Sequence, residues 1–222
     1  MWDNGEGLRF VRTVRVDENY LFTIDERVEN QTGAAVTLYP YGLVSRSGTP
    51  HTLGYYILHE GPVGVLQNRL VEVKYKDLKE ARAETGRSTG GWVGITDKYW
   101  AATLLPDTKA TVTAHMLTGS IGQMKTYQAD YLGDQLTVAP GASSTVNTRL
   151  FAGAKEVAIV DGYDKQLNLN RFELLIDWGW FYFITKPMFT AIHTLYLWIG
   201  NFGLAILAVT VIIKLIFFPL AS

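Results

Sequence analysis

The 222 residues of the chain are enough for one sizeable domain and an appendage. Hydrophobic residues make up 48% of the sequence and charged residues 18%, which is apolar for a wholly soluble protein. The formal net charge of −1 gives no electrostatic attraction to nucleic acid, and the lack of cysteine excludes disulfides and thiolate chemistry.

Both ends of the sequence look cut. The stretch from Met1 to Gly7 lacks the basic and apolar regions of a signal peptide. At the other end, Ser222 directly follows an apolar stretch, with no basic loop after it. We therefore expect an upstream segment that exports the first domain, and further spanning helices downstream.

Roughly the first 150 residues alternate between apolar and polar positions, as β-strands do. Apolar residues at 22, 24 and 28 share one parity, and polar residues at 23, 25, 27 and 29 share the other. Further strands are expected at 71–76, 110–116 and 135–138, with turn-forming clusters between the strands. Many short strands without a βαβ rhythm predict a mainly β fold, an antiparallel sandwich.

The pattern changes after the predicted strands. Residues 155–167 suit a short helix packed on the sandwich, and 166–170 form a polar connector. We therefore predict a domain at 1–165 and a linker at 166–175.

An aromatic-rich segment follows at 176–199, and it includes Trp178, Trp180 and Trp198. Its polar residues recur at spacings of three and four, which predicts one polar stripe on a helix. The stripe consists of Lys186, Thr190, His193 and Thr194. Such a helix is typical of a membrane interface, where Trp and Tyr are enriched. The alternative is a core helix of a soluble domain.

Residues 201–220 are almost uninterruptedly apolar, and their length matches the ~20 residues that cross a bilayer. From Phe202 to Leu220 only Thr210 and Lys214 are strongly polar, and they lie one helical turn apart on the same face. We predict a transmembrane helix in which this pair faces protein or water rather than lipid. The alternative is that Lys214 snorkels to the interface as an anchor.

Other candidate sites are weak. His51, His59, His115 and His193 lack metal-ligand spacing and are expected to be surface or core residues. The glycine-rich stretch 86–91 lacks the Gly-Lys-Ser/Thr of a phosphate loop, and no acid–base pair can be identified. We therefore expect no catalytic residues, metal or cofactor, and no enzymatic activity.

Several segments together resemble the YidC/Oxa/Alb family of membrane protein insertases, in particular its bacterial branch with a large periplasmic domain. The most specific stretch begins at Asp177. The segments that carry the resemblance are 58–65, 90–100, 177–189, 200–203 and 210–220.

The resemblance implies a periplasmic β-supersandwich in residues 1–175, an interfacial helix and the first helix of the insertase core, which runs from the periplasm to the cytoplasm of the bacterial inner membrane. It also implies that Lys214 lies at the basic position of a hydrophilic groove, with Thr210 at the polar position one turn before it. The family usually has arginine there, so this chain keeps the charge but loses the planar, multi-donor group.

The implied function is insertion and folding of inner-membrane proteins, alone or with the Sec translocon, and the implied partners are nascent membrane proteins and the lipid bilayer. One alternative is a membrane-tethered carbohydrate-binding or sugar-modifying sandwich. Another is a purely structural docking module. An anchoring helix would tolerate leucine at 214, whereas a groove helix would not.

Overall fold

The computed structural model describes residues 1–52, 58–78, 86–179 and 181–221, and at 220 and 221 only the backbone. The chain forms two compact units, Met1–Ile176 and Asp177–Ser222. The first is a β domain and the second consists of two helices.

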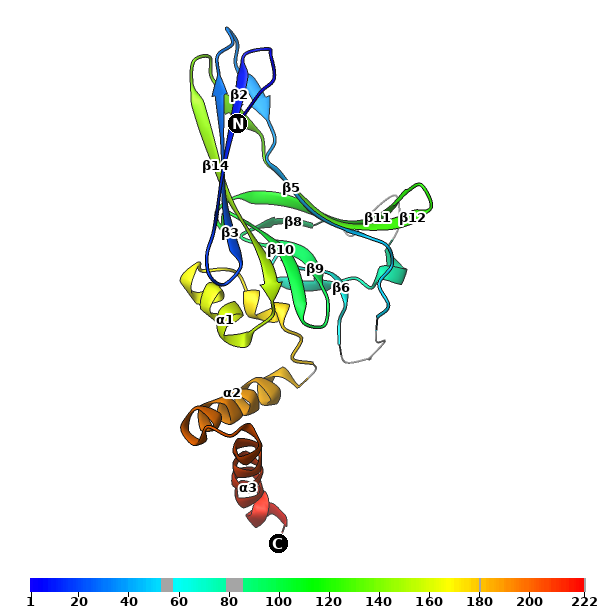
Figure 1. Ribbon diagram of the computed structural model, residues 1–222, viewed down its shortest axis with the longest axis vertical. Coiled ribbons are helices and arrows are strands. Elements are labelled where there is room, and N and C mark those ends of the chain that lie inside the picture. Colours follow the sequence, from blue (N-terminus) through cyan, green and yellow to red (C-terminus); the bar gives the residue numbers. More distant parts are fainter. Residues whose placement is uncertain (53–57, 79–85, 180, 222) are drawn as a thin grey trace. The chain divides into compact units, whose positions relative to one another are not determined.

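Two facing antiparallel sheets build the β domain, which confirms the predicted sandwich (Figure 1). Among the described residues, the larger sheet contains eight strands, which are, in order across it, β1 (Trp2–Asp3), β2 (Leu8–Val16), β3 (Leu21–Asn30), β14 (Ser143–Ala154), β10 (Trp100–Pro106), β9 (Trp92–Thr96), β6 (Gly61–Leu66) and β7 (Arg69–Glu72). The second sheet has the order β5 (Tyr41–Ser47), β12 (Met124–Gly133), β11 (Thr111–Ile121) and β8 (Gly86–Thr89). A short ladder joins β4 (Val36–Leu38) to β13 (Leu136–Val138).

The central strands of the larger sheet are buried on both faces. One face packs against the second sheet through residues such as Val93, Leu104 and Met116. The other face is covered by α1 (Val157–Gln166) and the 3₁₀ turn η2 (Phe172–Leu175). Strands β6 and β9 are therefore buried along their whole length, as expected for strands with packing on both sides.

Two sequence predictions need correction in this domain. The strand expected at 71–76 ends at Glu72, and Tyr75 instead lies in the 3₁₀ turn η1 (Tyr75–Asp77), where its ring is buried against Tyr127. The linker expected at 166–175 is part of the domain, because Leu169, Phe172 and Leu175 are buried in its core. The domain therefore ends at Ile176 rather than at residue 165.

The second unit contains α2 (Tyr182–Ile199) and α3 (Phe202–Ala221). Gly200 adopts the left-handed conformation (φ 71°) that ends α2, and its N–H donates to the Tyr196 carbonyl at 2.8 Å. The Asn201 side chain then caps α3 by accepting the Leu204 N–H at 3.1 Å. This two-residue elbow explains why an apolar segment divides into two helices here.

Candidate functional site

The polar pair of α3 lies on one exposed face of the helix. Thr210 and Lys214 are both exposed within the unit. The Thr210 hydroxyl donates to the Ile206 carbonyl at 2.8 Å, so its hydrogen is satisfied within the helix and its oxygen remains an acceptor. The Lys214 ammonium makes no hydrogen bond or ion pair with any residue that the structure describes. The pair therefore presents one charged ammonium and one acceptor oxygen along a single stripe.

A different face of α3 contacts α2. Ala205 is completely buried and Val209 is 6% exposed where the two helices pack, and the rings of Tyr196 and Phe202 meet edge to face at 5.8 Å. The small side chain of Ala205 suits such a contact between apolar helices. Contact with α2 thus leaves the Thr210–Lys214 stripe available to other partners.

By length and composition, α3 is long and apolar enough to cross a membrane over Phe202–Pro219, the one such helix among the described residues. Most of its large apolar side chains are exposed in this unit, including Leu207, Leu215 and Phe218. A helix that is apolar around most of its circumference and uncovered is typical of a lipid-facing span.

The predicted stripe of α2 is less polar than its composition indicates. The Thr190 hydroxyl donates to the Lys186 carbonyl at 3.0 Å, and the Thr194 hydroxyl to the Thr190 carbonyl at 2.8 Å. His193 stacks on Phe189 with an interplanar angle of 4°. Lys186 and His193 therefore contribute most of the outward polarity of this helix.

Two aromatic rings lie near the Lys186 ammonium. This ammonium lies 5.8 Å from the Trp178 ring centroid and 5.9 Å from that of Tyr182, within the range of cation–π attraction. Trp180, which belongs to the same aromatic segment, lies outside the described residues. None of the described α2 residues is buried, so the helix keeps its aromatic surface open.

The four histidines lie in separate surroundings. His51 is exposed, whereas His59 is buried and its Nε2–H donates to the Pro62 carbonyl at 3.0 Å. His115 pairs with Asp130, and His193 lies on α2. Among the described residues, no group of three or more His, Cys, Asp or Glu side chains could hold a metal ion.

Sequence reasoning missed a polar network on the outer face of the second sheet. His115 and Asp130 are cross-strand partners in β11 and β12, with Nδ1 and Oδ1 2.9 Å apart. Gln128 contacts Asp130 and also donates to the Tyr41 hydroxyl at 3.0 Å. Burial, followed by the charge of Asp130, raises the pKa of Tyr41. The strand register brings these residues together, and the sequence alone does not reveal that register.

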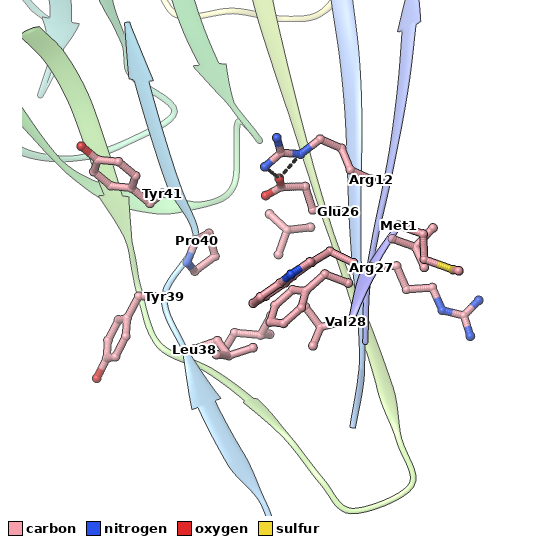
Figure 2. Close-up of a pocket in the computed structure, with 14 residues that line it drawn as sticks. Met1, Arg12, Glu26, Arg27, Val28, Leu38, Tyr39, Pro40 and Tyr41 are labelled. Atoms are coloured by element: carbon pink, nitrogen blue, oxygen red, sulfur yellow. Dashed lines mark hydrogen bonds and ion pairs between the residues drawn. The ribbon is translucent and has the colours of Figure 1, made fainter. Parts of the chain in front are cut away.

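A second feature absent from the sequence prediction is an apolar pocket of about 650 Å³, called here the β3–β5 pocket (Figure 2). Leu38, at the end of β4, and Pro40, just before β5, lie on one side, and Val28 of β3 lies on the other. An ion pair between Arg12 and Glu26, with Nε 2.6 Å from Oε1, lies at its edge. The lining is mainly apolar and includes none of the predicted site residues.

Comparison with known proteins identifies relatives over the whole chain. The family described as "YidC periplasmic domain" matches residues 1–191. Proteins named "Membrane protein insertase YidC" from Bradyrhizobium diazoefficiens, Nitrobacter hamburgensis and Rhizobium johnstonii are 56%, 58% and 48% identical, and each match covers 100% of this chain. The chain spans only 37–38% of the length of these relatives. Their names do not favour a carbohydrate-binding or sugar-modifying protein.

A solved structure described as a putative aldose 1-epimerase from Klebsiella pneumoniae is also similar. The two chains are 12% identical with a TM-score of 0.44, over 72% of this chain and 50% of the other. A similarity of this size supports no inference about activity.

Proposed function

Because the chain belongs to the YidC family, we propose that it is the periplasmic domain, interfacial helix and first core helix of a membrane protein insertase. The match of the periplasmic family to residues 1–191 supports the assignment of the β domain. The span-length apolar helix α3 supports the membrane part. In this proposal residues 1–175 lie in the periplasm of the bacterial inner membrane, and α3 runs from there to the cytoplasm.

The single observation that carries the mechanism is the uncovered stripe of Thr210 and Lys214 beside an α2 contact made by other residues. A central charge in a spanning helix costs about 2.5–3.5 kcal/mol on insertion scales, so it is expected to face water or other helices. A polar path of this kind lowers the cost of moving hydrophilic parts of a substrate into the bilayer. Its positive charge would attract acidic residues of the arriving segment.

The proposed partners follow from this mechanism. Nascent inner-membrane proteins are the substrates, and the lipid bilayer receives them. Sec translocon components are further proposed partners, because the resemblance to the family implies cooperation with them. The step is a transfer between environments and forms no covalent bond.

In the test, this chain replaces the matching part of the Bradyrhizobium diazoefficiens insertase, and Lys214 is then varied in the resulting full-length protein. Lys214→Arg should retain insertion of dependent substrates because it keeps the charge. Lys214→Ala should lose part of the insertion, most for substrates with acidic flanks, and Lys214→Glu should lose the most because attraction becomes repulsion. The readout is the fraction of substrate protected from added protease, measured together with insertase abundance.

A relocated lysine separates the groove from the anchor interpretation. Phe218 lies one turn after Lys214 on the same face, so a snorkelling lysine would serve as well there. Lys214→Ala combined with Phe218→Lys is expected to remain defective. Full insertion of all substrates by this double variant would show that the residue is an anchor.

A further inference from the structure

A pocket of about 540 Å³ lies in the β domain, apart from the β3–β5 pocket. Its described walls come from the 3₁₀ turn η1, the β11–β12 hairpin and residues within 49–52 and 58–60, which precede β6. Tyr75 and Tyr127, both at least nine-tenths buried, meet edge to face at 4.7 Å in its lining. The Tyr127 hydroxyl lies 2.6 Å from the Thr49 hydroxyl, which fixes the position of this ring. The pocket therefore has a rigid aromatic floor.

Three lysines surround this floor. Lys74 and Lys76 flank Tyr75 in the chain, whereas Lys125 comes from the start of β12, so two distant segments contribute lysines to the lining of one pocket. All three are exposed, and none of their ammonium groups makes an ion pair or hydrogen bond with a residue that the structure describes. Glu60 is the one carboxylate among the described lining residues. The described part of the lining is thus positively charged, in a chain whose formal net charge is −1.

Three ammonium groups around one pocket with a single described carboxylate, Glu60, repel one another, and an anion bound between them reduces this repulsion. Each ammonium offers three hydrogen-bond donors on a flexible stem, which suits the several oxygens of a phosphate or carboxylate. The tyrosine floor supplies an apolar surface against which the carbon part of a ligand can rest. A concave apolar surface with a few convergent polar groups is the usual form of a small-molecule site.

We propose that this lysine-rimmed pocket binds a ligand that carries a phosphate or carboxylate group. The ligand is either a soluble anion or the headgroup of an anionic lipid, since both present the same oxygens. This binding site is independent of Lys214 and of the proposed insertion mechanism, so either proposal can fail without the other.

Calorimetric titration of the full chain in neutral detergent micelles, at constant ionic strength, tests the proposal. Three probes distinguish the sources: inorganic phosphate, citrate and short-chain phosphatidylglycerol, with short-chain phosphatidylcholine as the uncharged control. The chain is expected to bind at least one anionic probe saturably. Tighter binding of phosphatidylglycerol than of both soluble anions would identify a lipid headgroup, and the reverse order would identify a soluble ligand.

The variant Lys74→Gln/Lys76→Gln/Lys125→Gln should bind at least about tenfold more weakly, since charge-assisted hydrogen bonds are lost. Lys109→Gln makes the same change of charge at an exposed lysine outside the pocket and should leave the affinity unchanged. Circular dichroism verifies that each variant is folded. If the triple variant is unfolded, the single variant Lys125→Gln, at the end of a hairpin, replaces it and should bind several-fold more weakly than the unmodified chain. No saturable binding by the unmodified chain, equal affinity in the lysine variants, or equal weakening by Lys109→Gln would overturn the proposal.

Discussion

Replacing Phe172 with alanine should lower the free energy of unfolding of the β domain by about 3–5 kcal/mol, the usual cost of removing a buried phenyl ring. Phe172 is completely buried, and its ring meets Trp92 at 5.4 Å and Phe151 at 5.9 Å, both edge to face. Neither neighbour can fill the space, because each is itself fixed in a central strand. Since domains of this size are stable by only about 5–15 kcal/mol, this is a large fraction of the total.

Urea unfolding of the full chain in mild detergent, followed by near-ultraviolet circular dichroism, measures the change. Tyr99→Ala is the matched control, because it removes an aromatic ring from the same domain at a site that is 64% exposed. The control should change the free energy of unfolding by no more than about 0.5 kcal/mol. If Phe172→Ala costs no more than Tyr99→Ala, then residues 166–175 are a linker after all and the burial of η2 is not a source of stability.

Two further predictions concern charge and membrane contact. The Tyr163 hydroxyl donates to Asp17 at 2.5 Å, and although burial raises the pKa of Asp17, this bond and backbone N–H groups outweigh it and lower that pKa. Tyr163→Phe should therefore cost about 1 kcal/mol at pH 7. The difference in urea midpoint should shrink as the pH falls from the ordinary pKa of an aspartate, about 3.9, through the lowered pKa of Asp17; a difference that stays constant down to the lowest pH at which the domain is folded would contradict the ion-assisted bond. Cysteine introduced at His193 should react with a membrane-impermeant reagent, whereas cysteine at Leu207, which no protein covers in this unit, should be protected by lipid. Strong labelling at both positions would mean that α3 does not span.

The local pattern of apolar and polar residues was sufficient to predict strands and helices whose conformation does not depend on one particular distant residue. The alternation at 22–29 lies in β3, and the helix expected at 155–167 is α1. Spacing of four residues also placed Thr210 and Lys214 on one face of α3, because helical geometry alone determines this.

Predictions failed where distant residues decide the environment. Polar Asn168 and Asn170 indicated a linker, yet the Asn170 carbonyl accepts a hydrogen bond from the buried Trp92 indole at 3.1 Å. The segment is held by strands about eighty positions earlier, which no local window can include. The same reason explains why both pockets and the His115–Asp130 pair were missed, since strand register and chain crossing bring their residues together.

The elbow at Gly200 and Asn201 has a consequence for distances along the membrane normal. At 1.5 Å per residue, the twelve residues from Phe202 to Lys214 extend about 18 Å along α3. If α2 lies at the surface of a hydrocarbon core about 30 Å thick, the lysine is slightly beyond the midplane of the bilayer. The elbow therefore sets the depth of the charge: lengthening it would move Lys214 towards the far side while leaving the sequence of α3 unchanged.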